Sequence, residues 1–149
     1  MDNQQERSAF ELGWLIGIID GEGSFWMSKG ISSNGQYQYY QPVFEIVNTN
    51  FEIISKIRCL FHQYSIPYYI GDGKRNSFSK PFKRIEVKGV KRLYYFFSKL
   101  MPYFECRKAQ ASLLNEFVQS RVHKSARDKY TERECVIYQE LKDLNHRGS

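Results

Sequence analysis

Apolar and polar positions alternate along the chain with two different periods, and these periods predict the secondary structure. Apolar residues recur every three or four positions in five segments, which is typical of amphipathic helices. They alternate with polar residues in four shorter segments, which is typical of strands. Helices are predicted at about 9–20, 50–61, 90–101, 108–122 and 132–145, and strands at about 24–30, 36–47, 66–71 and 82–88. The order α-β-β-α-β-β-α-α-α indicates an α+β fold with an antiparallel sheet that helices cover on one face.

Local signals mark several boundaries of these elements. Three capping boxes, in which Ser or Thr is followed three residues later by Glu, predict helix starts at Ser8, Thr49 and Thr131. The dipeptide Asn34-Gly35 predicts a tight turn between the first two strands. Pro102 is expected to end the third helix. A chain of 149 residues is long enough for one hydrophobic core. We expect one domain over 1–149, with its core in about 8–122 and a helical extension in about 130–145.

The first helix is apolar on almost every side, whereas a helix on the surface of a soluble protein keeps a polar face. One stripe is expected to pack on the core and comprises Leu12, Leu15, Ile16 and Ile19. Gly13 and Gly17 lie one turn apart on a neighbouring stripe that ends at Asp20 and is flanked by Trp14. A second copy of the chain is a plausible cover for this smooth stripe. We therefore expect a homodimer with Gly13, Trp14, Gly17 and Asp20 at its interface.

The same helix ends in two carboxylates set among glycines, in the order Asp20, Gly21, Glu22 and Gly23. A two-fold axis at the glycine stripe brings the tips of two such helices together. Clustered carboxylates repel each other unless a cation lies between them, and Mg²⁺ prefers oxygen ligands and phosphate. The alternative is structural: the glycines permit close internal packing, and the acids cap the turn into the first strand. The pattern alone leaves both interpretations open.

Residues 15–23 resemble a known motif. Their sequence, Leu-Ile-Gly-Ile-Ile-Asp-Gly-Glu-Gly, is similar to the LAGLIDADG motif of homing endonucleases, including the first glycine, the paired acids and the closing glycine. The α-β-β-α-β-β-α order is similar to that family through about residue 122. The resemblance implies the LAGLIDADG fold, in which helices cover one face of a saddle-shaped antiparallel sheet, here followed by a C-terminal helix.

The resemblance also implies an activity and a cofactor. Family members with one motif are homodimers whose motif helices form the interface, and they cut double-stranded DNA in a Mg²⁺-dependent reaction. The second acid of the motif is the family's metal ligand, which corresponds to Glu22, with the Gly21 carbonyl sharing the ion and Asp20 supporting the turn. This chain has Glu where the motif's name has Asp, so the side chain that binds the metal is longer. Mn²⁺ is expected to substitute for Mg²⁺, and Ca²⁺ to bind without supporting cleavage.

Two further catalytic groups follow from the same resemblance. Family members place a polar residue after the second strand and a basic residue before the helix that follows the third, both near the catalytic water. The matching positions here are Asn48, assigned to the water network, and Arg107 or Lys108, assigned to the stabilisation of phosphate charge. The alternative for the two cations is a solvated helix N-terminus, although cations there oppose the helix dipole.

Composition narrows the classes of protein. An apolar fraction of 42% and a mean hydropathy of −0.56 are typical of a soluble globular protein, and no apolar stretch is long enough to span a membrane. The three cysteines, Cys59, Cys106 and Cys135, are odd in number and far apart, which argues against a disulfide scaffold or a zinc knuckle. We expect an intracellular protein, in the cytoplasm of a prokaryote or in an organelle.

Charge points to a nucleic-acid partner. The chain has 22 basic and 16 acidic residues, a net charge of +6. The window 72–92 contains only Asp72 and Glu86 as acids, so its surplus of six equals the net charge of the chain. Its basic residues are Lys74, Arg75, Lys80, Lys83, Arg84, Lys88, Lys91 and Arg92. A basic stripe is typical of nucleic-acid binding, and a solvated face is its alternative.

The predicted sheet has the dimensions to read duplex DNA. The strand 36–47 is about 40 Å long at ~3.3 Å per residue, close to one turn of B-DNA at about 34 Å, and a two-stranded ribbon fits the major groove. Base-edge contacts are expected from the first hairpin's Ser24, Trp26, Ser28, Tyr39, Gln41 and Glu45, and from Tyr69, Lys74, Arg75, Arg84 and Glu86 of the second. Phosphate contacts are expected from Lys29, Lys80 and Lys88.

Together these observations predict a homodimeric, Mg²⁺-dependent, site-specific double-stranded DNA endonuclease that cuts a long, near-palindromic target. The alternative is a protein that binds nucleic acid without cutting, either an intron maturase that holds RNA or a DNA-binding regulator. Retention of both Asp20 and Glu22 argues against the regulator and less strongly against the maturase. The chain begins with Met1 and shows no Cys or Ser at a splicing junction, which favours a free-standing product encoded in an intron.

Overall fold

The computed structural model describes residues 2–147, and within them the predicted order of elements is confirmed. The elements are α1 (Asn3–Glu22), β1 (Ser24–Ile31), β2 (Gln38–Asn48), α2 (Phe51–Gln63), β3 (Tyr69–Gly73), β4 (Phe82–Lys88), α3 (Val90–Leu100), α4 (Lys108–Arg121) and α5 (Glu132–Arg147). A 3₁₀ turn, η1 (Met101–Tyr103), joins α3 to α4. Met1, on which the expectation of a free-standing product depends, lies outside the described residues.

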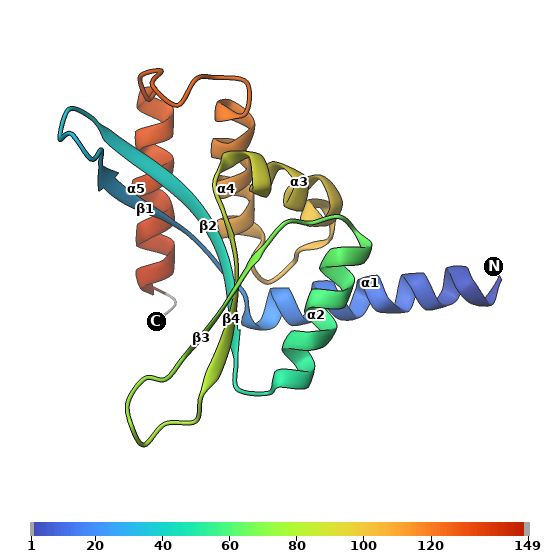
Figure 1. The fold of residues 1–149 in the computed structure, drawn as a ribbon. Coiled ribbons are helices and arrows are strands. Elements are labelled where there is room, and N and C mark those ends of the chain that lie inside the picture. Colours follow the sequence, from blue (N-terminus) through green and yellow to red (C-terminus); the bar gives the residue numbers. More distant parts are fainter. Residues whose placement is uncertain (1, 148–149) are drawn as a thin grey trace.

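The four strands form one antiparallel sheet in the order β1-β2-β4-β3. The sheet is strongly twisted, so the β1–β2 and β3–β4 hairpins diverge at their ends (Figure 1). In the centre, Phe44 of β2 lies opposite Phe25 of β1 on one side and Val87 of β4 on the other. These three side chains are buried, which defines the inner face of the sheet.

Helices cover that inner face, and their aromatic side chains form the centre of the core. The ring of Phe25 lies 5.2 Å from that of Phe44 and 5.5 Å from that of Phe104, measured between centroids. Phe96 of α3 packs 4.7 Å from Phe44. Tilted and edge-on pairs of this kind add to the stabilisation that burial of the rings supplies. The helical layer thereby fixes the sheet, and the opposite face stays available for a partner.

Two of the three predicted helix starts are wrong by position. Helix α1 begins at Asn3, because Asp2 caps it and its side chain accepts the backbone N–H of Gln5 at 2.8 Å. Ser8 therefore lies within the helix and does not cap it. The N-terminal part of α1 extends away from the rest of the chain (Figure 1). Helix α2 is capped by Asn50, whose side chain accepts two backbone N–H groups.

The third predicted capping box is confirmed. The Thr131 Oγ1 accepts the backbone N–H of Glu134 at 3.1 Å, and the Glu134 carboxylate accepts that of Thr131 at 2.8 Å. Strand β3 starts at Tyr69, three residues later than predicted, because Ile66 is buried in the core and Pro67 has no N–H to donate to a sheet. No helix among residues 2–147 is long and apolar enough to cross a membrane.

Candidate active site and nucleic-acid interface

Asp20 connects the end of α1 to the segment that precedes α4. Its two carboxylate oxygens accept the backbone N–H groups of Glu105, Cys106 and Arg107 at 3.0, 2.9 and 2.8 Å. Burial raises the pKa of the Asp20 carboxyl, but the three hydrogen bonds outweigh burial and hold the pKa below its ordinary value of 3.8. The Asp20 carboxylate thus makes these hydrogen bonds within its own chain. Its effect is to fix Arg107 beside the tip of the motif helix.

Replacing Asp20 with asparagine is expected to lower the free energy of unfolding by about 1.5–3 kcal/mol, the usual worth of hydrogen bonds to a charged group. Because the folded-state pKa is lowered, this stabilisation is complete above the ordinary pKa of 3.8 and is lost as the pH falls through the lower folded value. Urea unfolding at pH 7 and at stepwise lower pH measures both effects. The control Asp143→Asn changes an exposed residue, and an equal loss in both variants would contradict the assignment.

Glu22 lines a basic hollow of about 680 Å³. The hollow is lined by Gly21, Glu22, Val47, Asn48, Thr49, Arg75, Ser79, Lys80, Phe82 and Arg107. The Glu22 carboxylate accepts a hydrogen bond from the Asn48 side-chain amide at 2.7 Å. The structure therefore brings four of the predicted catalytic and metal-binding positions, Gly21, Glu22, Asn48 and Arg107, into one place.

Two predicted catalytic residues, Asp20 and Lys108, do not line the hollow. Arg107 is half-buried, precedes the first residue of α4 and lines the hollow, whereas Lys108 is exposed and is not among the lining residues. The hydrogen bond from the Arg107 backbone to Asp20 holds this part of the chain beside the end of the motif helix. Of the two cations that the sequence left open, Arg107 is the one that lies at the hollow with Glu22 and Asn48.

The donor set for a metal ion is incomplete in one chain. Glu22 is the only carboxylate among the described residues that line the hollow. Within residues 2–147, no three His, Cys, Asp or Glu side chains gather in a group that could hold an ion. The available oxygens are the Glu22 carboxylate and the neighbouring Gly21 carbonyl. Such a set fits Mg²⁺ only if a second chain or a phosphate supplies further oxygen ligands.

The outer face of the sheet carries most of the predicted DNA-binding residues. The register places Ser28 opposite Gln41, and Glu45 opposite Glu86, so these side chains lie on one surface. Arg84 lies 3.4 Å from Glu45 and 3.7 Å from Glu86, and Lys88 lies 3.4 Å from Glu86. These partly exposed ion pairs contribute little to stability. Their side chains can therefore exchange partners when a polyanion approaches.

Two predicted DNA contacts of the first hairpin, Trp26 for a base edge and Lys29 for a phosphate, do not lie exposed on the outer face of the sheet. Val43 is fully buried between Trp26 and Lys88 in the register. The Trp26 Nε1 is buried and has no hydrogen-bond partner within the described residues. Lys29 lies on the inner face, with its ammonium 5.9 Å from the rings of Tyr40 and Tyr138. The structure thus separates Lys29 from the other predicted phosphate contacts.

The loop between β3 and β4 reaches the candidate catalytic hollow. Of its predicted DNA-binding residues, Arg75 and Lys80 line the hollow and Lys74 is exposed. The Asn76 side chain shapes the loop, because its oxygen accepts the backbone N–H of Phe78 at 2.9 Å and the Ser79 hydroxyl at 3.0 Å. The basic window of the sequence therefore extends from the outer sheet face to the hollow.

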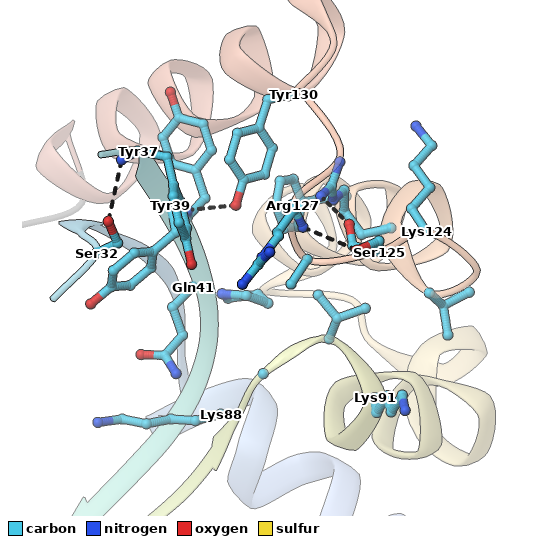
Figure 2. Close-up of a pocket in the computed structure, with 18 of the residues that line it drawn as sticks. Ser32, Tyr37, Tyr39, Gln41, Lys88, Lys91, Lys124, Ser125, Arg127 and Tyr130 are labelled. Atoms are coloured by element: carbon cyan, nitrogen blue, oxygen red, sulfur yellow. Dashed lines mark hydrogen bonds between the residues drawn. The ribbon is translucent and has the colours of Figure 1, made fainter. Parts of the chain in front are cut away.

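A second, larger hollow of about 1290 Å³ lies at the other end of β2. The predicted DNA-binding residues Tyr39, Gln41 and Lys88 line one side of it, and the loop between α4 and α5 lines the other (Figure 2). Lys124 and Arg127 of that loop are among the lining residues. The sequence predicted no role for them, because the charged composition of 123–129 is typical of a linker.

The comparisons with known proteins identify the fold. Neither a protein-family model nor a curated protein matches the sequence. Among solved structures, the archaeal intron-encoded homing endonuclease I-Vdi141I in complex with DNA matches with a TM-score of 0.62 at 16% identity, over 93% of this chain and 99% of that one. The homing endonuclease I-CvuI in complex with a DNA target gives 0.62 at 17%, over 94% and 98%.

A longer protein shares the same fold. The I-LtrWI LAGLIDADG homing endonuclease bound to target DNA matches with a TM-score of 0.62 at 20% identity, over 89% of this chain but only 43% of that one. The chain therefore has the LAGLIDADG homing endonuclease fold, and the resemblance predicted from residues 15–23 is confirmed at the level of the fold.

Proposed function

We propose that the chain is a homodimeric, Mg²⁺-dependent, site-specific DNA endonuclease that hydrolyses one phosphodiester bond in each strand. The observation that carries this proposal is the candidate catalytic hollow. There, the second acid of the motif, an amide and a cation from three distant parts of the chain converge beside the outer face of the sheet. A binding protein has no need for an exposed carboxylate among basic residues, because the carboxylate repels phosphate.

The solved structures of similar fold support a DNA substrate. I-Vdi141I, I-CvuI and I-LtrWI are each described in complex with DNA, and I-CvuI with 2 mM Mg²⁺ or 2 mM Ca²⁺. In this chain, Arg84 and Lys88 of the outer face are balanced by Glu45 and Glu86, and the adjoining β3–β4 loop adds the positive charge of Lys74, Arg75 and Lys80. Strand β2 has the length of about one helical turn of DNA. We infer that the β1–β2 ribbon follows the major groove and that the hollow receives the scissile phosphate.

The residues at the hollow have separate tasks in this proposal. Glu22 and the Gly21 carbonyl would hold Mg²⁺, together with oxygens from the second copy and the substrate. When bound, Mg²⁺ stabilises the negative charge that develops on the phosphate. Asn48 holds the Glu22 carboxylate in place through its 2.7 Å hydrogen bond. Arg107, fixed by Asp20, donates to a phosphate oxygen and opposes the same developing charge.

The glycine stripe of α1 supports the proposed dimer. Gly13 and Gly17 are exposed, and a Cβ atom built on either would meet nothing within 4 Å. Packing inside this chain therefore does not require glycine at these positions, which argues against the part of the structural alternative that concerns the glycines. Because glycine has no side chain, the backbone of a second α1 could cross close to this stripe. The Glu22 of that second copy would then complete the ligand set.

Replacing Gly17 with leucine is expected to convert the dimer to a monomer without unfolding it. Leucine has a better helix propensity than glycine by about 0.5–1 kcal/mol, and the open space around Gly17 accommodates its side chain. Multi-angle light scattering gives the mass, and thermal unfolding checks the fold. The control Ser8→Leu places the same side chain at an exposed position of α1, on the opposite side of the helix from Gly17, and it is expected to stay dimeric. A wild-type chain that is monomeric at high concentration would overturn the proposed dimer.

The test of the activity is cleavage of a plasmid library that carries random duplex inserts, with Mg²⁺ and with Ca²⁺. Cutting of one near-palindromic site of about two helical turns, with Mg²⁺ only, is the expected result. A folded dimer that cuts nothing, but binds a structured intron RNA more tightly than any duplex, would replace the nuclease with a maturase.

A further inference from the structure

One row of side chains crosses all four strands on the outer face of the sheet. Ser24 of β1, Glu45 of β2, Glu86 of β4 and Tyr69 of β3 are successive partners in the register. The two glutamates therefore lie directly opposite each other on neighbouring strands. Like charges in this arrangement destabilise a sheet. Folding gives no reason for this pair, and a departure of this kind from the rules of stability is typical of a functional site.

Arg84 lies on the same face and is only loosely paired with the two carboxylates. Its guanidinium is 3.4 Å from Glu45 and 3.7 Å from Glu86, which is longer than the roughly 2.7–2.9 Å of a charge-assisted hydrogen bond. The Arg84 Nε has no hydrogen-bond partner within the described residues. The side chains of Arg84 and Glu45 are 41% and 25% exposed. Both groups therefore keep hydrogen-bonding capacity for a ligand on this face.

The chemistry of these groups selects one kind of base pair. A carboxylate only accepts hydrogen bonds and a guanidinium only donates them. In the major groove, the N4 amino group of cytosine is a donor, and the O6 and N7 atoms of guanine are acceptors. Thymine and guanine present an acceptor where cytosine presents its amino group, so each of them would repel a carboxylate. A neighbouring carboxylate and guanidinium thus match the two bases of a C·G pair.

The position of Glu45 on β2 places this contact close to the point of cleavage. Glu45 precedes Asn48 of the catalytic hollow by three residues, or about 10 Å of strand at ~3.3 Å per residue. One base pair adds about 3.4 Å along the duplex, so the contact lies about three base pairs from the cut. Val43 and Val47 flank Glu45 on the outer face of β2 and have no side-chain hydrogen bond to offer. Glu45 is therefore the polar reader of β2 in this part of the groove.

We propose that Glu45 and Arg84 make the enzyme specific for a C·G base pair about three base pairs from the cut in each half-site. Glu45 accepts from the cytosine N4 amino group, and Arg84 donates to O6 and N7 of the paired guanine. Glu86 is a positioning residue that holds the Arg84 guanidinium from its other side. The proposal rests on the proposed function, because it needs duplex DNA on the outer face of the sheet. The carboxylates also repel phosphate, which lowers the affinity for DNA of other sequences.

The test measures binding by fluorescence anisotropy in Ca²⁺ to a series of duplexes derived from the target recovered from the cleavage library. In each duplex, the second, third or fourth base pair from the cut is changed to one of the other three pairs, in both halves. Wild type is expected to prefer C·G about tenfold or more at one of these positions. Glu45→Gln is expected to switch this preference to A·T, because a glutamine amide matches N6 and N7 of adenine. It is also expected to bind a mixed-sequence duplex about threefold more tightly, since each chain loses a charge that repels phosphate.

Two further variants separate base reading from charge. Arg84→Lys keeps the positive charge but loses the planar fork that matches guanine. It is expected to lose about tenfold of the preference for C·G and to leave the Kd for the mixed-sequence duplex within about twofold of wild type. The matched control Glu6→Gln removes a carboxylate from the exposed N-terminal part of α1 and is expected to keep the wild-type preference. Circular dichroism checks that each variant is folded.

A wild-type chain that prefers another pair, or no pair, at all three positions overturns the proposed base reading. So does a Glu45→Gln variant that keeps the wild-type preference for C·G. Either result leaves the nuclease in place, because the wild-type chain still binds and cuts its target. If the folded wild-type chain binds no duplex, the proposed function fails and the base reading fails with it.

Discussion

Replacing Glu22 with glutamine is expected to abolish DNA cleavage while leaving the fold and duplex binding intact. The side chain is exposed, and its one hydrogen bond within the described chain comes from the Asn48 amide. Glutamine keeps the size of the side chain and an oxygen that accepts this bond, so the substitution removes only the charge. Loss of one electrostatic stabiliser of a transition state costs about 10²–10³ in rate. A glutamine amide is also a poor ligand for Mg²⁺, so we expect at least the upper value.

Single-turnover cleavage of the selected target measures this loss, and anisotropy in Ca²⁺ measures binding. The control Glu105→Gln removes a carboxylate from an exposed residue two positions before Arg107 that does not line the hollow. It is expected to retain the wild-type rate within about threefold, since exposed charges outside the hollow are screened. A Glu22→Gln variant that cuts within tenfold of wild type would mean that Glu22 holds no ion. In that case, the family's metal position would not apply to this chain.

The contrast between Asp20 and Glu22 shows how far the sequence pattern reaches. The two acids are separated by one glycine in the motif, and periodicity places Asp20 on the same stripe as Gly13 and Gly17. In the structure, its carboxylate instead accepts three backbone N–H groups from residues more than eighty positions away in sequence. A single sequence contains no signal for such a contact, because backbone donors look the same at every position. Glu22, which makes no such contact, could be placed by the motif alone.

The same limit explains which cations were found. The basic window 72–92 is continuous in sequence and alternates along strands, so a period of two predicted its side chains on the outer face of the sheet. Lys124 and Arg127 lie beside them only because α4 and α5 fold back across the end of β2. The helix starts predicted at Ser8 and Thr49 were wrong for a local reason, because Asp2 and Asn50 cap these helices instead. Several capping residues stand close together there, and the pattern does not rank them.

Replacing Arg121 with methionine is expected to lower the free energy of unfolding by about 3–5 kcal/mol, the range for removing one partner of a buried ion pair. The side chains of Arg121 and Glu134 are 4% and 1% exposed. Methionine fills most of the space, but it leaves the Glu134 carboxylate charged in a dry environment with hydrogen bonds only from Ser120 and Thr131. Urea unfolding followed by tryptophan fluorescence gives the change in stability.

The double variant Arg121→Met with Glu134→Gln separates the charge from the packing. Glutamine can still accept the backbone N–H of Thr131 in the capping box but carries no charge, so we expect it to recover at least about 1 kcal/mol of the loss. Arg133→Met is the surface control, because Arg133 pairs with Glu116 at 2.7 Å with half of its side chain exposed. That change is expected to cost under about 1 kcal/mol. If Arg121→Met costs no more than Arg133→Met, the buried pair with Glu134 and the bonds to the carbonyls of Ser125 and Asp128 do not hold the α4–α5 loop.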